Sequence, residues 1–345
     1  MQSLSATLST TWPGSVPGIP YRPLDRGLSI QLRCVECHEN LASLSYRSPA
    51  QSQSNYFCTA CSATLRQEQG IWMALPSARQ AHFARFVKEY QHIRKEEGRG
   101  SADPEFYLAL PFRDLSGRNA WQWTIRGKTF RYMERRILPE LVWSGNPSLA
   151  ILDLGAGNGW MSFRLAEMGH RPVAVDLLTN SCDGLGAASH YRSKLPELFP
   201  RFRAELDNLP FAAEQFDCAI FNASFHYSEN YERTLAEAIR CVRPGGTMMI
   251  ADSPTYSRED SGQQMRKERQ EYFLQRFGFR SEALDSCEYL TPERMLALGA
   301  HHELEWTTHK IWYGMRWASR PLVAKLRKRR EPSQFLLYSA QVKGQ

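Results

Sequence analysis

The stretch Ile151–His170 reads Ile-Leu-Asp-Leu-Gly-Ala-Gly-Asn-Gly-Trp-Met-Ser-Phe-Arg-Leu-Ala-Glu-Met-Gly-His. Its apolar start suits a buried parallel strand, and the residues from Trp160 onward supply the packing face of a helix. Between them, Gly155, Gly157 and Gly159 permit a tight turn and let a ligand approach the backbone without a Cβ in the way. The stretch therefore predicts a strand, a ligand-binding turn and a helix.

The spacing of these glycines separates two kinds of nucleotide-like cofactor. A dinucleotide fingerprint is Gly-x-Gly-x-x-Gly, but position 160 holds Trp and the third glycine comes one residue early. The motif instead resembles the Asp-x-Gly-x-Gly-x-Gly signature of class I S-adenosylmethionine-dependent methyltransferases. In isolation, such a turn is also compatible with a purely structural role. The resemblance implies that the methionine and ribose parts of S-adenosylmethionine lie beside Asp153, Gly155, Ala156, Gly157, Asn158 and Gly159, with the acid near the methionine amino group.

Further motifs follow the turn in the order of that family. Asp176 ends a second apolar strand and lies 21 positions after Gly155, close to the interval of about 20 residues at which an acid accepts hydrogen bonds from ribose hydroxyls. The segment 207–211 resembles the family's Asp-x-x-Pro-Phe segment, whose acid approaches the adenine amino group. By this resemblance, the cofactor site also includes Asp176, Leu177, Asp207, Asn208, Leu209 and Asn222.

The order of predicted elements gives the fold class. The resemblance covers about 149–342, with strands at 216–222 and 247–252 and a helix at 234–242 between them. The last two strands, at 304–312 and 335–342, are expected to pair antiparallel at the edge of the sheet. We therefore expect an α/β fold with a Rossmann-like, seven-stranded methyltransferase sheet and a small N-terminal zinc ribbon.

The composition agrees with a soluble, cytoplasmic enzyme. The chain has 345 residues, 42% of them hydrophobic, but no run of about 18 uninterrupted apolar residues that would predict a transmembrane helix. Residues 1–28 are rich in Ser, Thr and Pro and lack a basic start and an apolar block, so they predict a flexible tail rather than a signal peptide. The net charge, 43 minus 36 or +7, permits an anionic partner without requiring one.

Two Cys-x-x-Cys pairs, separated by 20 residues, predict a zinc ribbon. Four thiolates complete a tetrahedral shell with no position left for water, so the Zn²⁺ would be structural. A disulfide pair is the alternative, but nothing in the sequence indicates secretion; His38 is a further candidate ligand. The predicted ligands are Cys34, Cys37, Cys58 and Cys61, whereas Cys182, Cys218, Cys241 and Cys287 are expected to be small buried residues.

These signals divide the chain into a tail (1–28), a zinc-ribbon domain (29–76), a helical linker and lid (77–145) and the methyltransferase domain (146–345). The ribbon and the Gly-Ile-x strand after it resemble the zinc-ribbon activator of transfer-RNA and protein methyltransferases, here fused rather than bound. The linker should contain an amphipathic helix ending near Glu97 and a second helix at 120–137. Its aromatic side chains would line the pocket or pack between the two modules.

Methyl transfer from a sulfonium is an in-line displacement, so alignment is the main requirement and a base is needed only if the acceptor loses a proton. His226 follows the fourth strand, where the family places substrate-facing groups, and is the first candidate base. It would otherwise hydrogen-bond within its loop. Tyr227, Asn222 and Ser224 are lesser candidates. The strand end has no Asn-Pro-Pro-Tyr or Pro-Cys element, which disfavours amino-methylation of adenine and cysteine-adduct chemistry on pyrimidines.

A basic insertion at 313–330 carries seven Lys and Arg residues, no acid, and interleaved apolar residues. It fits a solvated helix covering the sheet edge, a peripheral contact with an anionic membrane or lipid-linked substrate, or a nucleic-acid contact. The leading hypothesis is methylation of a small metabolite, natural product or lipid-linked intermediate. The alternatives are an RNA methyltransferase that uses the ribbon and the insertion to bind RNA, and a non-catalytic regulator that has kept the fold.

Overall fold

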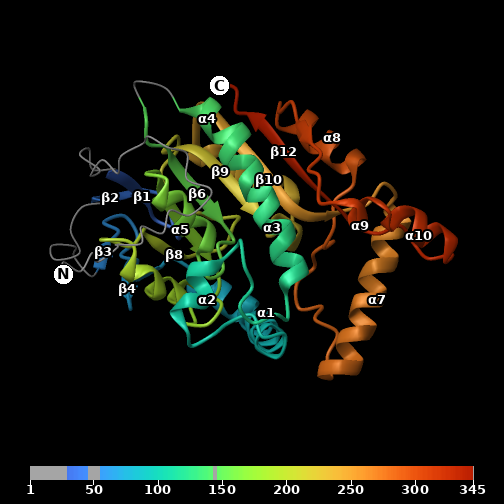
Figure 1. Ribbon diagram of the computed structural model, residues 1–345. Coiled ribbons are helices and arrows are strands. Elements are labelled where there is room, and N and C mark those ends of the chain that lie inside the picture. The colour runs from blue at the N-terminus through green and yellow to red at the C-terminus, as the bar shows by residue number, and fades with distance from the viewer. Residues whose placement is uncertain (1–28, 46–54, 143–145, 345) are drawn as a thin grey trace, which may run out of the picture.

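The computed structural model describes residues 29–45, 55–142 and 146–344 (Figure 1). The predicted tail, 1–28, lies outside the described residues. The strands are β1 (Ser29–Arg33), β2 (Asn40–Ser45), β3 (Asn55–Phe57), β4 (Thr64–Glu68), β5 (Ile71–Met73), β6 (Ala150–Leu154), β7 (Arg171–Asp176), β8 (Arg201–Arg203), β9 (Phe216–Asn222), β10 (Val242–Thr255), β11 (Thr307–His309) and β12 (Gln334–Gln341).

The main α-helices are α1 (Ser77–Glu96), α2 (Pro104–Ala109), α3 (Ala120–Tyr132), α4 (Leu138–Leu141), α5 (Trp160–Glu167), α6 (Tyr231–Cys241), α7 (Glu259–Phe277), α8 (Pro292–His301), α9 (Met315–Ala318) and α10 (Arg320–Leu326). A π-helix joins α3 to α4, so the predicted helix at 120–137 changes its hydrogen-bond pattern after Tyr132. The helix α8 begins with a capped first turn, in which the Thr291 hydroxyl accepts a hydrogen bond from the Arg294 amide and Pro292 occupies the first turn.

The large sheet has the strand order β11-β12-β10-β9-β6-β7-β8-β5-β4-β3. Its first seven members form the predicted Rossmann-like methyltransferase sheet, in which β6 to β9 are parallel and β12 is antiparallel to both β10 and β11. The predicted count of seven strands needs one correction, because three N-terminal strands extend the sheet to ten. The reason is edge pairing: β5 lies parallel to β8 and satisfies backbone groups that β8 would otherwise expose.

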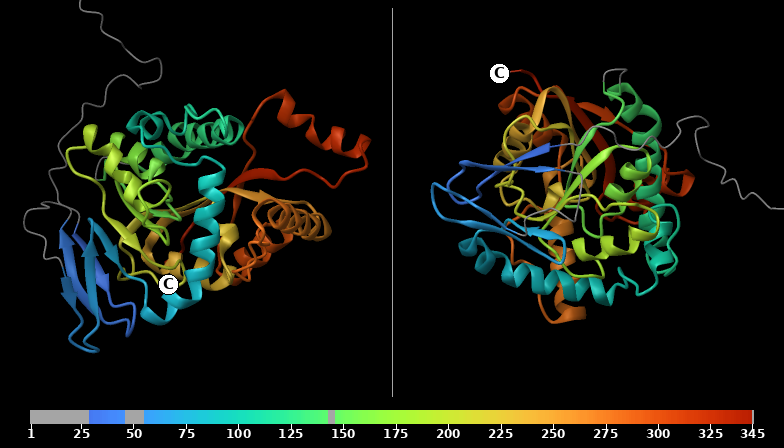
Figure 2. Two further views of the ribbon diagram at one scale, coloured as in Figure 1. Left: turned by 90° about the horizontal axis from the view of Figure 1, so that it is seen from below. Right: turned by 90° about the vertical axis from the view of Figure 1, so that its left-hand side faces the viewer.

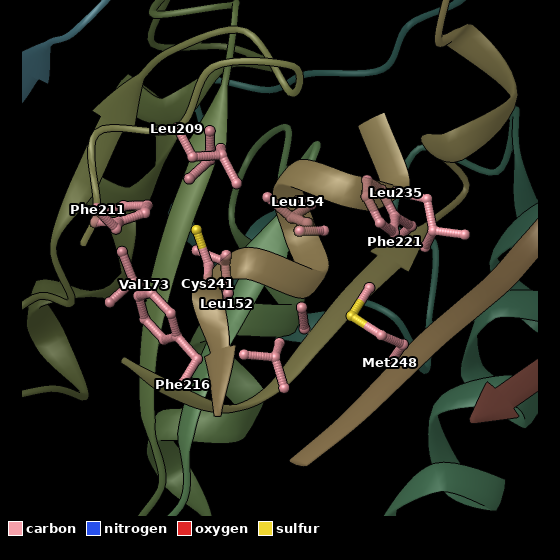
Figure 3. Packing of buried hydrophobic residues seen from close by; sticks show 14 of the residues in the cluster. Leu152, Leu154, Val173, Leu209, Phe211, Phe216, Phe221, Leu235, Cys241 and Met248 are labelled. Atoms are coloured by element: carbon pink, nitrogen blue, oxygen red, sulfur yellow. The ribbon is translucent and has the colours of Figure 1, made fainter. Parts of the chain in front are cut away.

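Helices cover both faces of the sheet, so its central strands are buried on both sides. Leu152 of β6 and Phe221 of β9 contribute to a core that includes Leu235 of α6 (Figure 3). The neighbouring residues in sequence, Ile151 and Ile220, point to the other face and join the core beneath α3 and α5. All five residues of β6 are buried, as the apolar run predicts.

The N-terminal ribbon packs onto the same core as the sheet. Ile30, Leu32 and Trp72 belong to the cluster shown in part in Figure 3. Leu32 forms a β-bridge with Phe211, and the Arg33 amide donates to the Pro210 carbonyl at 3.0 Å. The domain boundaries at 76/77 and 145/146 stay predictions. Strands on both sides of the 76/77 boundary, β5 and β8, pair within one sheet.

The C-terminal part differs from the predicted pattern in two ways. The strand expected at 304–312 is reduced to β11, although its antiparallel pairing with β12 at the sheet edge is as expected. The basic insertion forms two short helices, α9 and α10, rather than one. They project from the body of the molecule (Figure 2, left) at the opposite end of the sheet from the ribbon (Figure 1). Within the described part of the chain, no helix has the length and apolar character that a membrane crossing requires.

Candidate active site

The predicted cofactor turn opens into a pocket at the carboxyl ends of β6, β7 and β9. This edge is where ligands bind in open α/β sheets. The empty volume, which includes the open mouth, is about 910 Å³. We refer to it as the first pocket.

The glycine turn takes its shape from two close approaches. The amides of Gly155 and Ala156 both donate to the Val175 carbonyl, at 2.8 and 3.0 Å, which holds the turn against the end of β7. Gly155 has a φ of +75°, and a Cβ there would lie 2.2 Å from the Cβ of Ser224. Gly157 has a φ of +55°, but a Cβ there would meet nothing closer than 3.6 Å. Position 155 therefore needs glycine for packing, whereas position 157 faces open space.

Two acids at strand ends face the first pocket. The Asp176 carboxylate accepts hydrogen bonds from the Gly157 and Leu178 amides, both at 2.8 Å, and burial raises its pKa to about 6. The Asp153 carboxylate accepts from the Ser162 hydroxyl at 2.7 Å, and burial raises its pKa to about 7. Both acids would gain from a ligand that brings a cation or hydrogen-bond donors.

The residues of this pocket fit S-adenosylmethionine. Asn222 Oδ1 is buried, lines the pocket and has no hydrogen-bond partner among the described residues, so a ligand donor is the partner that it lacks. Arg94 and Asp183 also line the pocket and form an ion pair, with Nη2 donating to Oδ1 at 3.0 Å. Tyr90 supplies an aromatic surface beside them.

Eight of the twelve predicted cofactor residues line the first pocket: Asp153, Gly155, Ala156, Gly157, Asn158, Asp176, Leu177 and Asn222. The other four, Gly159, Asp207, Asn208 and Leu209, do not. Gly159 caps the start of α5 in a left-handed conformation.

The segment after β8 uses its polar groups within the fold. The Asp207 carboxylate accepts a hydrogen bond from the Thr234 hydroxyl. The side-chain amide of Asn208 donates to the Val35 carbonyl of the ribbon at 2.7 Å, and the backbone amide of Leu209 donates to the Glu237 carboxylate. The segment that resembles an adenine-binding motif thus anchors the ribbon and α6, while Ala204 and Leu206 line the pocket in its place.

A second pocket adjoins the first and shares with it Phe86, Tyr90, Arg94, Arg126, Ala223 and Tyr227. Its empty volume is about 1110 Å³, again including its mouth. Of the two predicted catalytic residues, Tyr227 lines both pockets and His226 lines the second. The adjoining positions suit a cofactor and an acceptor that must meet.

His226 is buried, and its Nδ1 lies 3.2 Å from the Ser253 hydroxyl. Burial, reinforced by Arg269 and Arg126, lowers its pKa to about 3. The imidazole is therefore neutral at physiological pH and a weaker base than an ordinary histidine.

Asp252, near the carboxyl end of β10, also lines the second pocket and was not among the predicted site residues. Thr129 donates to its Oδ1 at 2.7 Å, while its buried Oδ2 has no partner in the described part of the chain. Its φ is +53°, and burial raises its pKa to about 6. Its position in the sequence could have indicated Asp252 as a site residue, because Asp153, Asp176 and Asp252 all lie at or near the carboxyl end of a strand.

The four predicted zinc ligands come together in the ribbon. Their sulfur atoms all lie within 4.8 Å of one another, with Cys34–Cys61 at 3.6 Å and Cys37–Cys58 at 3.4 Å. These separations are too long for disulfides and close to the sulfur–sulfur edge of about 3.8 Å in a tetrahedral site with Zn–S bonds of about 2.3 Å. Cys182, expected to be buried, is exposed instead.

The two halves of this cluster have the same backbone geometry. The Cys34 carbonyl accepts from the His38 amide, and the Cys58 carbonyl accepts from the Ser62 amide, with left-handed φ angles at both donor residues. His38 is outside the four-residue cluster. The repeat of one turn around the four sulfurs fits a single structural metal ion.

A family model matches the part of the chain that contains the central strands of the sheet. Residues 152–250 match the family model described as a methyltransferase domain. Over 107 residues, the chain is 24% identical to the malonyl-[acyl-carrier protein] O-methyltransferase of Buchnera aphidicola, a match that covers 30% of this chain and 39% of that one. Over 109 residues, it is 34% identical to the demethylmenaquinone methyltransferase of Corynebacterium urealyticum, covering 32% and 44%. The chain thus spans about two fifths of these curated relatives.

Two solved structures align with this chain at lower sequence identity. The 1,6-didemethyltoxoflavin-N1-methyltransferase of Burkholderia thailandensis is 16% identical with a TM-score of 0.43, covering 85% of this chain and all of that one. A complex of the Haloferax volcanii Trm112 methyltransferase activator with a methyltransferase includes a chain that is 18% identical with a TM-score of 0.44, covering 71% of this chain and all of that one. The sheet order and the family match together identify a methyltransferase domain with the class I, S-adenosylmethionine-dependent fold.

Proposed function

We propose that this protein methylates a small-molecule acceptor, with S-adenosylmethionine in the first pocket and the acceptor in the second. The observation that carries the proposal is the pair of adjoining pockets, each lined by a buried oxygen without a described partner: Asn222 Oδ1 in the first and Asp252 Oδ2 in the second. Bound S-adenosylmethionine would supply an electrophilic methyl group.

In the first pocket, different side chains at the strand ends would bind different parts of S-adenosylmethionine. Asp176 keeps the lone pairs that it does not use on backbone amides available for the ribose hydroxyls. Asp153 and Asn222 provide acceptors for the methionine amino group, consistent with the orphaned amide oxygen. Asp207, Asn208 and Leu209, also predicted to bind the cofactor, support it indirectly by fixing the loop that follows β8.

For an acceptor that loses a proton, Asp252 is a better base than His226. A carboxylate with a pKa of about 6 is mostly ionised at neutral pH and still has useful proton affinity, whereas a histidine with a pKa of about 3 has little. Asp252 Oδ2 would take the proton from an acceptor N–H or O–H group. His226 and Tyr227 would then shape the acceptor site rather than move the proton.

A small acceptor is favoured over RNA by the walls of the second pocket, which mix aromatic and charged side chains from α1, α3 and α7 around a cavity of metabolite size. By their names, the related proteins described above are methyltransferases of malonyl-[acyl-carrier protein] and of demethylmenaquinone, so small acceptor groups are consistent with the domain. An RNA acceptor is the alternative, with the ribbon and the segment 313–330 as its binding surface.

The ribbon and the basic insertion have separate proposed roles. The four cysteines bind structural Zn²⁺, and the ribbon then acts like the activator that it resembles, by extending the sheet through β5. The insertion contacts an anionic membrane, because Met315, Leu322 and Leu326 are exposed beside its Lys and Arg residues. Exposed leucines suit a lipid surface better than RNA, whose phosphates need only the cations.

The test of the main proposal combines binding with product analysis. Calorimetry should show one S-adenosylmethionine bound per chain, and incubation of cell extract with the methyl-labelled cofactor should place label in a small compound. Label in RNA would favour the alternative function. No binding of the cofactor or of S-adenosylhomocysteine would refute the proposal and revive a non-catalytic regulator.

A further inference from the structure

The charged residues of the second pocket do not all pair with one another. Arg99 Nε donates to Glu97 at 2.8 Å, Arg269 pairs with Glu288, and Arg94 pairs with Asp183 of the first pocket. Those three pairs leave one arginine, Arg126, and one acid, Asp252, both lining the second pocket without an ion-pair partner in the described chain.

Two arginines present unused donors to this space. Arg99 is only 5% exposed, and its Nη1 is buried without a hydrogen-bond partner among the described residues. Arg126 lies over the Trp123 ring at 4.9 Å. Burial, together with the charges of Arg94 and Arg99, lowers the pKa of Arg126 to about 10, although Asp252 opposes the shift. Arg94, Arg99 and Arg126 thus line the same pocket, and an anion would relieve the repulsion that Arg126 experiences from the other two.

The backbone around the same pocket is unusually strained. Of the ten non-glycine residues with positive φ in the described chain, four line the second pocket: Ala223, Asp252, Ser281 and Glu288. Such conformations are energetically unfavourable and gather where a ligand site requires a particular geometry. Their concentration here is a separate indication that the cavity is built for a ligand.

The remaining wall is apolar. Ile125, Phe273, Leu284 and Phe335 line the pocket from α3, α7, the segment after α7 and β12. Aromatic and aliphatic walls with a few fixed polar groups are typical of sites for small organic ligands. The lining of the pocket therefore combines arginine side chains, apolar side chains and one acid, Asp252, that has no ion-pair partner in the described chain.

We infer that the acceptor is an amphiphilic acid: an apolar body with one carboxylate or phosphate group, which Arg99 and Arg126 bind, and an N–H or O–H group, which donates to Asp252. This inference rests on the proposed function, because it defines the substrate class of the same site. The two guanidinium groups offer paired donors to either anion, and the aromatic wall covers the apolar body.

Binding of simple probes tests the inference without the natural substrate. We expect phenyl phosphate or benzoate to bind the full-length protein in calorimetry with S-adenosylhomocysteine present, and benzyl alcohol to bind at least about tenfold more weakly. The comparison of the two acids distinguishes phosphate from carboxylate recognition.

Arg99→Gln is the discriminating variant, because Arg99 lines only the second pocket. It should weaken binding of the acid about tenfold or more and leave S-adenosylhomocysteine affinity unchanged. Arg113→Gln, at an exposed arginine outside both pockets, is the matched control and should change neither. Arg126→Gln should weaken acid binding and, since Arg126 lines both pockets, reports in addition on the cofactor.

The outcomes separate the inference from the proposed function. Cofactor binding with no preference for acids over benzyl alcohol, or with an Arg99→Gln variant that binds acids normally, would overturn the inference and leave the proposed function standing. Loss of cofactor binding in the wild-type protein would overturn the proposed function. Thermal unfolding of each variant shows whether a lost affinity reflects misfolding.

Discussion

Acids at the carboxyl edge of the sheet differ in how their oxygens are used. Asp176 accepts two backbone amide hydrogens and thereby fixes the glycine turn and the start of the loop after β7. Asp252 bonds only to Thr129 through Oδ1 and leaves Oδ2 without a described partner, on a backbone held in a left-handed conformation. Asp176 therefore fixes the loop and can bind a ligand, whereas Asp252 has one carboxylate oxygen that is available to a ligand.

Gly157→Arg should abolish cofactor binding by filling the first pocket. A Cβ at this position has room, since its nearest neighbour would be 3.6 Å away, although the φ of +55° strains any side chain. The rest of the arginine side chain must enter the open space. We expect the dissociation constant for S-adenosylhomocysteine to rise by about 100-fold or more in calorimetry. Gly117→Arg, at a glycine with a φ of +67° and open surroundings away from the pocket, controls for backbone strain. Unchanged binding in Gly157→Arg would mean that the turn does not hold the cofactor.

Asp252→Asn should remove a proton acceptor while keeping the backbone, because asparagine tolerates left-handed φ angles. Burial raises the pKa of Asp252 to about 6 against an ordinary 3.8, so its ionised fraction increases as the pH rises through about 6. With a substrate that loses a proton, kcat should rise over that window and then level off. The variant should lose about 100-fold or more in kcat and lack this rise.

The stability of the same variant provides the control. An acid whose folded pKa is raised destabilises the fold when it ionises, so stability is greatest below pH 3.8 and falls as the pH approaches about 6. Removing the charge should therefore leave the thermal midpoint at pH 7 unchanged or higher. A variant that is active and follows the wild-type pH profile would exclude Asp252 as the base.

Residue-level prediction from the sequence succeeds where one local geometry demands one residue type. The turn requires glycine at 155 because Ser224 lies against it, and this requirement is visible in the motif itself. Asp207 illustrates the opposite case, because an acid after a strand can turn toward a ligand or toward a neighbouring helix. The Thr234 hydroxyl of α6, 27 residues away, decides the outcome. Arg126 was hidden in the same way, since nothing in a helix sequence tells which arginine lacks a partner.

The helices α9 and α10 carry apolar side chains that the rest of the described chain leaves exposed. Trp317 anchors them by stacking on Phe335, with ring centroids 5.4 Å apart. No residue of either helix is buried, and Met315 and Leu326 remain 75% and 76% exposed. The expectation that this insertion covers the sheet edge with an apolar side is met only by Tyr313 and Trp317, because Met315, Leu322 and Leu326 are exposed.

We therefore predict that the protein binds vesicles containing anionic phosphatidylglycerol more strongly than vesicles of phosphatidylcholine. The double variant Leu322→Ser/Leu326→Ser should lower the partition coefficient in a sedimentation assay about tenfold or more, because each buried CH₂ contributes about 0.8 kcal/mol. Leu296→Ser, at a leucine of α8 that is 74% exposed, should have no effect. Equal binding to both vesicle types, or an unchanged partition coefficient in the double variant, would contradict the membrane contact.

At the scale of the whole molecule, the sequence predicted most of the seven-stranded sheet because β6, β7, β9, β10 and β12 contain local apolar runs, whereas β8 and β11 are three-residue strands without such a run. It did not predict that β3, β4 and β5 would continue the sheet, because edge pairing between 71–73 and 201–203 joins segments that are about 130 residues apart. The consequence is energetic. Ile30, Leu32 and Trp72 lie in the same core as β6 and β9, so the ribbon and the sheet should unfold together.

Because the core is shared, we expect the four-cysteine cluster to affect the stability of the entire described chain. The purified protein should contain one Zn²⁺ by elemental analysis, and Cys58→Ser should remove it. Because folding of a ribbon is coupled to metal binding, the variant should unfold on the order of 10 °C lower, in a single transition seen by both far-ultraviolet circular dichroism and tryptophan fluorescence. Cys182→Ser, at an exposed cysteine outside the cluster, should keep the zinc and the midpoint. A zinc-free variant that melts like the wild type would show that the cluster stabilises only its own turns.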